Sequence, residues 1–128
     1  MNDVTPRETG SKPNVYFIDD SATMREVVKI AFRRENFNVV TCSDMASAVA
    51  QFGETVPDAV ISDVIMPDMN GIEAAISIRG FLPTCKILLF SGQAATADLL
   101  ENARTRGYEF EILAKPVHPQ DLLTKLRG

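Results

Sequence analysis

The stretch NVYFIDDSATMRE, residues 14–26, runs four apolar or aromatic side chains directly into two adjacent carboxylates, Asp19 and Asp20. The apolar run is typical of a strand that is covered on both faces. One acid after such a strand commonly caps the next helix, but two adjacent carboxylates repel each other and resist burial. The pair therefore indicates either a bound cation or a reaction that uses its charge.

The same kind of apolar run recurs four more times along the chain. The five predicted strands are residues 15–18, 38–41, 59–62, 86–90 and 111–114. Helical periodicity follows each of them: a first helix contains residues 24–32, and later helices are expected at about 44–53, 71–80, 95–106 and 119–127. Five strands that each lead into a helix imply right-handed crossovers, and hence an α/β fold with a parallel sheet.

Two of these helices have clear apolar stripes. The stripe of the first helix is formed by Met24, Val27, Val28, Ala31 and Phe32. Ser21 stands where its hydroxyl can cap that helix. The last helix begins at Pro119, a favoured first helical residue, and its stripe is formed by Leu122, Leu123 and Leu126. Both stripes predict helices that pack against the sheet.

Length and composition favour one globular domain without a membrane segment. The chain has 128 residues, of which 45% are hydrophobic and 23% charged, and its apolar runs are far too short to span a bilayer. The net charge of -4 and the pI near 4.9 argue against direct nucleic-acid binding, which normally needs a basic face. Cys42 and Cys85 lie far apart without a CxxC motif, which favours two reduced, buried thiols.

The first 13 residues are predicted to form a tail outside the folded domain. Residues 1–13 are polar and lack the apolar segment of a signal peptide, so we expect a flexible N-terminal tail, a folded domain over residues 14–128 and a cytoplasmic location. Met1 suggests a native start, and any further domain would then follow Gly128. The sequence leaves open whether the chain is a stand-alone protein or the front of a longer one.

Residues that end parallel strands gather at one edge of the sheet, where open α/β folds bind their ligands. At these positions the chain has Asp19 and Asp20, then Asp63, Ser91 and Lys115. Clustered carboxylates are hard oxygen ligands that suit Mg²⁺, with Mn²⁺ as an alternative. A carboxylate beside such a metal can act as a nucleophile and form an acyl phosphate, and Asp63 is the natural candidate. Singly, each residue also has an ordinary role as a cap, turn or strand end, but their meeting at one edge favours a function.

Four motifs together resemble the receiver domain of two-component response regulators: FIDDS at 17–21, ISDVIMPDMNG at 61–71, LLFSG at 88–92 and LAKP at 113–116. The resemblance covers residues 14–128. It implies a flavodoxin-like (βα)5 fold with a five-stranded parallel sheet in the order 2-1-3-4-5. It also implies a domain that takes phosphate from a sensor histidine kinase or a histidine phosphotransfer protein and then changes how it binds a downstream protein.

The resemblance assigns a role to each residue at the sheet edge. Asp63 corresponds to the phosphoacceptor and Asp20 to a direct Mg²⁺ ligand, while Asp19 acts mainly through metal-bound water. The backbone carbonyl of Ile65 would be the remaining protein ligand of the metal.

The other two side chains correspond to groups that contact the phosphoryl oxygens. Ser91 matches the hydroxyl that moves onto the phosphoryl group, and Lys115 matches the lysine that pairs with it. The resemblance further implies a cis peptide bond between Lys115 and Pro116.

One position departs from the family pattern. Ile112 stands where many receivers carry a Tyr or Phe whose ring turns inward on activation. Tyr108 and Phe110 alternate with Ile112, which places all three on the same side of the predicted strand. We expect the loop of residues 91–98, rather than these rings, to transmit the movement of Ser91.

Three interpretations of the function are compared. A receiver is a signalling domain rather than an enzyme, although it takes part in its own phosphorylation and dephosphorylation. A haloacid-dehalogenase-like phosphatase also uses an Asp nucleophile with magnesium, but its DxDx[TV] signature needs an Asp where this chain has Ser21. A pseudo-receiver that only binds partners is disfavoured, because every acceptor-site position holds a competent residue. His118 is more commonly a surface residue than a phosphate carrier and is not assigned to the site.

The sequence does not identify the partners. The cognate kinase, the stimulus and the downstream protein are left open. A homodimer through the face of the fourth and fifth helices is also left open.

Overall fold

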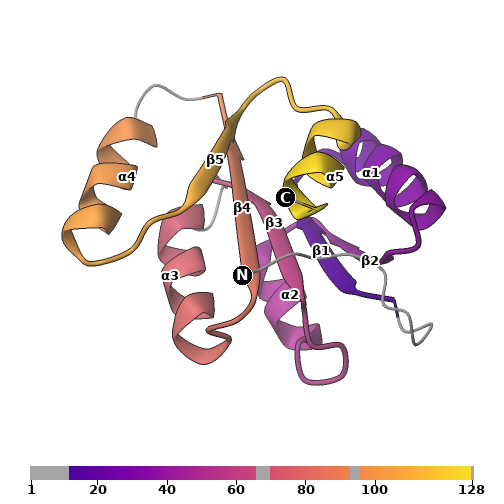
Figure 1. Cartoon of the computed structure of the whole chain (residues 1–128), viewed down its shortest axis with the longest axis horizontal. Helices are drawn as coiled ribbons and strands as arrows, with labels where there is room; N and C mark the ends of the chain where they lie inside the picture. The colour runs from indigo at the N-terminus through magenta and orange to yellow at the C-terminus, as the bar shows by residue number, and fades with distance from the viewer. Residues whose placement is uncertain (1–11, 66–69, 93–95, 128) are drawn as a thin grey trace.

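A computed structural model describes residues 12–65, 70–92 and 96–127 (Figure 1). Within these residues, strands and helices alternate strictly along the chain. The strands are β1 Asn14–Ile18, β2 Asn38–Cys42, β3 Ala59–Asp63, β4 Lys86–Ser91 and β5 Glu111–Ala114. The helices are α1 Ala22–Arg34, α2 Met45–Gln51, α3 Gly71–Phe81, α4 Thr96–Thr105 and α5 Pro119–Arg127. The strands form one parallel sheet in the order β2-β1-β3-β4-β5, which confirms the expected fold class and strand order.

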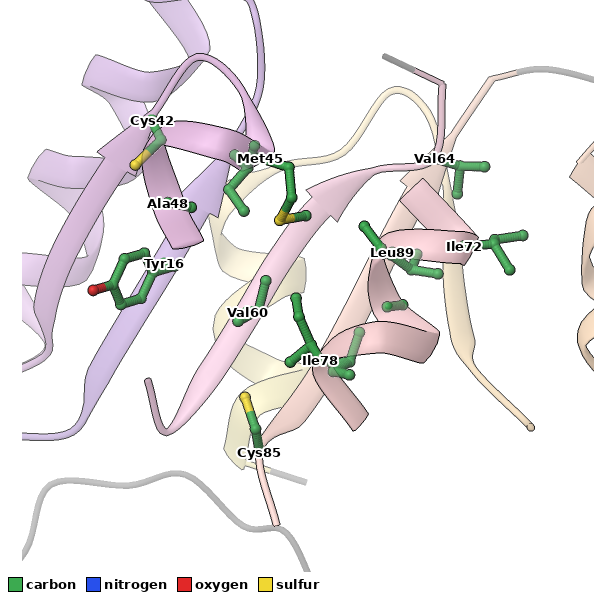
Figure 2. Packing of buried hydrophobic residues seen from close by; sticks show 14 of the residues in the cluster. Tyr16, Cys42, Met45, Ala48, Val60, Val64, Ile72, Ile78, Cys85 and Leu89 are labelled. Atoms are coloured by element: carbon green, nitrogen blue, oxygen red, sulfur yellow. The ribbon is translucent and has the colours of Figure 1, made fainter. Parts of the chain in front are cut away.

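Helices cover both faces of the sheet, and each face has its own hydrophobic core. α1 and α5 pack on one face, at the right of Figure 1, and form what we call the α1–α5 layer. The α2–α4 layer covers the other face, and Figure 2 shows its core, in which Tyr16, Val60 and Leu89 of the sheet lie with Met45 and Ile78 of the helices. Because both faces are covered, every residue of β3 is buried, which explains the continuous apolar runs in the sequence.

Side-chain caps begin the helices that follow β1 and β2. Ser21 Oγ accepts a hydrogen bond from the Met24 N–H at 3.2 Å, which confirms Ser21 as the cap of α1. Asp44 Oδ1 accepts from the Ser47 N–H at 2.8 Å in the same way. α2 is shorter than the helix predicted over 44–53: it begins at Met45, because Asp44 is its cap, and it ends at Gln51.

The apolar stripe of α1 is narrower than its spacing predicts. Val28 and Phe32 are fully buried, and Met24 and Ala31 pack against the same core. Val27, however, is 44% exposed and lies at the edge of the stripe. A helix that rests on a sheet buries only the side chains nearest the sheet, so the predicted stripe was one residue too wide. In α5 all of the predicted leucines are buried: Leu122, Leu123 and Leu126.

The two cysteines are structural. Cys42 and Cys85 are buried and carry free thiols, as predicted. Burial raises the pKa of the Cys85 thiol to about 12, and it raises the pKa of the Cys42 thiol as well. Because the thiolate is the reactive form, both side chains act as small apolar groups of the core.

The described part of the chain begins against the sheet. Pro13 is buried, and its carbonyl accepts a hydrogen bond from the Asn38 N–H at 2.9 Å. Residues 1–11 of the expected tail lie outside the described residues, so the flexible tail remains a prediction. Among the helices that the structure describes, none is long and apolar enough to cross a membrane.

Candidate functional site

The strand ends bring the predicted site residues to one edge of the sheet. Asp63 is the last residue of β3 and pairs in register with Phe90 of β4. Ser91 is the last residue of β4, and Lys115 follows directly after β5. β3 and β4 therefore each run one residue further than predicted. The peptide bond between Lys115 and Pro116 is cis, as the family resemblance implied.

A polar pocket of about 250 Å³ opens at this edge, and its lining residues are Asp20, Asp63, Ile65, Gly92 and Lys115. Lys115 Nζ lies 2.5 Å from Asp63 Oδ2, and the Ile65 N–H donates to Asp63 Oδ1 at 3.0 Å. The Asp63 side chain is 8% exposed, whereas that of Lys115 is 42% exposed. The hydrogen bond to Asp63 is the main reason why the pKa of Lys115 is raised, while partial burial opposes it. The carboxylate is thus buried but can be reached from the pocket.

Asp19 and Asp20 differ in their surroundings. Asp19 is only 4% exposed, whereas Asp20 is exposed and lines the pocket. Asp19 Oδ1 accepts from the Ser21 N–H at 3.2 Å, and the Asp19 N–H donates to the Cys42 carbonyl at 3.1 Å. Burial is the largest cause that raises the pKa of Asp19, and the neighbouring Asp20 and Asp63 raise it further. Asp19 is therefore a buried charge that the fold accommodates at a cost.

Asp19→Asn is expected to raise the free energy of unfolding at pH 7, because the amide fills the same place without a buried charge. A carboxyl group whose folded-state pKa is raised destabilises the fold above that pKa, and the penalty fades as pH falls through it toward the ordinary value of 3.8. The gain should therefore shrink as pH falls through the raised pKa of Asp19 and vanish below the ordinary value of 3.8, as measured by urea unfolding across pH without divalent metal. Asp44→Asn is the matched control, since Asn caps a helix as well as Asp and no such gain is expected. A gain for Asp19→Asn that did not depend on pH would contradict the buried-charge explanation.

Arg25 of α1 also reaches this edge, although the sequence did not single it out. Its Nη1 donates to the Asp19 carbonyl oxygen at 2.8 Å. This hydrogen bond holds the peptide that joins Asp19 to Asp20. No sequence signal points to it, because a contact from a helix side chain to a backbone oxygen six residues earlier has no characteristic spacing.

The residues directly after Asp63 pair with residues at the start of α3. Ile65 pairs with Asn70 in an isolated antiparallel bridge, and the Gly71 N–H donates to the Val64 carbonyl at 2.6 Å. Asn70 also caps α3 with its side chain. Ile65 is 44% exposed and lines the pocket. This pairing holds the backbone that directly follows Asp63.

The donor groups at this edge fit a small, hard cation. Asp20, Asp63 and Ile65 line one pocket, with Asp19 buried beside them. In the parts of the chain that the structure describes, no three Asp, Glu, His or Cys side chains converge closely enough to enclose a metal. Mg²⁺ does not need such a cage, because it keeps several waters and is usually held by one or two carboxylates. The oxygen donors of Asp20, Asp63 and Ile65 are therefore compatible with Mg²⁺.

Comparison with known proteins identifies the family. The sequence profile described as the response regulator receiver domain matches residues 15–127 of the chain. The chain belongs to the response regulator receiver domain family. This receiver domain is thus a CheY-like signalling domain of two-component systems.

Relatives of known name agree with the family. The probable transcriptional regulatory protein TcrX of Mycobacterium tuberculosis is 30% identical over 122 residues, which are 95% of this chain and 51% of TcrX. The chemotaxis protein CheY of Thermotoga maritima is 30% identical over 113 residues, 88% of this chain and 92% of that protein. The chain thus spans about half the length of some curated relatives, such as TcrX, and nearly all of others.

Solved structures agree as well. The chemotaxis response regulator CheY4 of Vibrio cholerae superposes with a TM-score of 0.76 at 27% identity, over 91% of this chain and 97% of that chain. The likeness extends over nearly the whole domain, which accords with the strand order described above.

In this receiver domain, Ile112 stands at the position where many members of the family are expected to carry an aromatic residue. Ile112, Tyr108 and Phe110 all pack against the α2–α4 layer. β5 begins at Glu111, so Tyr108 and Phe110 precede the strand, and their predicted alternation along it stays a prediction. The rings of Tyr108 and Phe110 stack with centroids 6.2 Å apart and planes 3° from parallel. Residues 93–95 of the loop predicted to transmit the switch lie outside the described residues. The loop therefore stays a prediction.

Proposed function

We propose that this receiver domain accepts a phosphoryl group on Asp63 from the phosphohistidine of a sensor histidine kinase or a histidine phosphotransfer protein. The observation that carries the proposal is the buried Asp63 carboxylate, which faces a polar pocket, contacts Lys115 and lies beside Asp20. Phosphorylation would change the binding of a downstream protein. Hydrolysis of the acyl phosphate would return the domain to its resting state.

The transfer needs a positioned nucleophile and positive charge, which the site residues supply. An Asp63 oxygen attacks phosphorus, the new P–O bond forms as the N–P bond breaks, and the imidazole leaves with the electron pair. The Ile65 N–H holds Oδ1 and so sets the plane of the carboxylate. Lys115 has three N–H donors, and its ammonium, which now contacts Asp63 Oδ2, would pass to the oxygens of the arriving phosphoryl group. The Ser91 hydroxyl, buried at the end of β4, is the second donor proposed for these oxygens.

Asp20, Asp63 and the Ile65 carbonyl would hold Mg²⁺, or Mn²⁺ in its place, and Asp19 would act through metal-bound water. The metal would neutralise charge on the phosphoryl oxygens. The proposal is supported by the place of these donors in one pocket and by the burial of Asp19 close to two other carboxylates.

Asp20→Ala is expected to weaken Mg²⁺ binding by about tenfold, because it removes one of two direct carboxylate ligands. Calorimetric titration of the metal-free protein measures the affinity. Glu54→Ala removes an exposed acid of the same charge from the segment after α2, and it should leave the affinity unchanged. Equal binding by Asp20→Ala and the wild type would remove Asp20 from the ligand set.

Incubation of the wild-type protein with acetyl phosphate and Mg²⁺ tests the function directly. The expected product is one phosphoryl group per chain, lost on treatment with hydroxylamine and absent when the metal is chelated. A phosphatase would instead turn over unrelated phosphate esters, but the position of its second acid is held by Ser21, whose side chain caps α1. A pseudo-receiver would take up no phosphate at all, and a parallel assay with unrelated phosphate esters separates a receiver from a phosphatase.

A further inference from the structure

Phe90 lies next to the ion pair of Asp63 and Lys115. Its place in a core strand does not require a contact with either residue. It precedes Ser91 in β4 and is 2% exposed. The Lys115 ammonium lies over its ring, with Nζ 5.5 Å from the ring centroid. A cation within about 6 Å of an aromatic face is attracted by the ring quadrupole. Lys115 therefore has two partners of different kinds, the Asp63 carboxylate and the Phe90 ring.

The ring is itself held in place. Phe17 of β1 stacks on Phe90, with centroids 5.7 Å apart and planes 6° from parallel, and both rings belong to the core of the α1–α5 layer. The stem of Lys115 runs beside Gly92, where an added Cβ would lie 3.5 Å from Lys115 Cβ. A lysine side chain that is 42% exposed has many rotamers, and ordering it costs entropy. The fixed Phe90 ring below the ammonium limits the number of rotamers that Lys115 can adopt.

We propose that Phe90 is a positioning residue: its ring holds the Lys115 ammonium beside Asp63, in place for the oxygens of an incoming phosphoryl group. The inference rests on the proposed phosphoryl transfer to Asp63. When Asp63 becomes an acyl phosphate, the charge of its carboxylate is lost and the original ion pair weakens. The contact between the ammonium and the ring does not depend on that charge. Phe90 thus keeps Lys115 at the site in both states.

Fluorination of the ring separates this role from simple packing. Phenylalanine with one, two or three ring fluorines, placed at position 90 by site-specific incorporation, keeps nearly the same shape but weakens the quadrupole stepwise. The rate of labelling by acetyl phosphate at saturating Mg²⁺ is expected to fall with each fluorine, by about two- to fivefold in total, while the Mg²⁺ affinity stays constant. The same series at position 17 is the matched control. Phe17 lies in the same stack but no contact with Lys115 is expected of it, so its series should leave the rate unchanged.

A double-mutant cycle checks that the effect passes through the lysine. Phe90→Leu should slow labelling in the wild-type background and have no further effect in a Lys115→Met background. Phe17→Leu removes a ring of equal size from the same core and controls for the loss of packing. If fluorination at positions 90 and 17 had equal effects, or if Phe90→Leu slowed labelling equally in both backgrounds, Phe90 would be a packing residue only.

A measurement without phosphate distinguishes this inference from the proposed function. The ε-methylene protons of Lys115, observed by NMR with labelled lysine, should be shifted upfield by the ring and should lose that shift in Phe90→Leu but keep it in Phe17→Leu. An unshifted signal in the wild type overturns the positioning role whether or not Asp63 is labelled. A shifted signal in a protein that takes up no phosphate supports the placement of Lys115 by Phe90 and refutes the proposed transfer.

Discussion

Asp63→Asn is expected to lower labelling by acetyl phosphate and Mg²⁺ by on the order of a hundredfold or more, because the amide has no anionic oxygen to attack phosphorus. The substitution hardly changes volume. Its side-chain oxygen can still accept the hydrogen bond from the Ile65 N–H that Asp63 Oδ1 accepts now. The loss of labelling should therefore report the missing nucleophile rather than a changed fold. Intact-protein mass spectrometry followed by peptide mapping measures both the amount and the position of the phosphoryl group.

The control for this substitution is Asp44→Asn. It makes the same chemical change at the cap of α2, away from the pocket, and Asn is an equally good cap. Asp44→Asn should be labelled like the wild type. Undiminished labelling of Asp63→Asn would show that another side chain accepts the phosphoryl group, and the peptide map would then point first to Asp20, which lines the same pocket.

Gly71→Ala is expected to destabilise the domain by about 1–3 kcal/mol, because the added methyl group has no space. A Cβ at this position would lie 2.4 Å from the Asp63 carbonyl oxygen and 2.8 Å from the Val64 Cα. Both atoms belong to the backbone, so neither can move aside by a change of rotamer. The chain must shift where β3 ends, and Asp63 would be displaced from Lys115. Labelling of the folded fraction is therefore expected to fall together with stability.

Gly80→Ala is the matched control in the same helix. Nothing lies within 4 Å of a Cβ added at Gly80, and alanine is the better helix former, so stability should rise by about 0.5–1 kcal/mol. Urea unfolding measures both variants, and labelling by acetyl phosphate of Gly80→Ala should match that of the wild type. If Gly71→Ala were as stable and as readily labelled as the wild type, the close approach of α3 to the end of β3 would not constrain the site.

The sequence was enough to predict the sheet and the residues at its edge, because both depend on position along the strands. Continuous apolar runs follow from burial on two faces, and parallel strands bring Asp63, Ser91 and Lys115 to the same edge whatever the details of packing. The width of the buried face of α1 did not follow from the sequence. Val27 and Val28 are equally apolar, and only the angle of the helix on the sheet decides that Val28 is buried and Val27 exposed.

Contacts between residues that are far apart along the chain could not be predicted from the sequence either. In the sequence, Phe90 is indistinguishable from the other apolar residues of its strand. Only the fold shows that the Lys115 ammonium lies over its ring. The need for glycine at position 71 likewise depends on how closely α3 approaches the backbone of β3. Such features arise from the distances between elements, and no periodicity of the chain encodes them.

The end of β4 contacts both helical layers, one on each face of the sheet. Successive side chains of a strand point to opposite faces, so Phe90 faces the α1–α5 layer while Ser91 lies on the side of Leu89, which faces the α2–α4 layer. These two adjacent residues therefore lie on opposite faces of the sheet: Phe90 contacts Lys115, and the Ser91 hydroxyl is the group proposed to contact the phosphoryl oxygens. In the proposed phosphorylated state, a change at this single strand end would reach both helical layers, so a downstream protein bound on either face of the sheet would be affected by it.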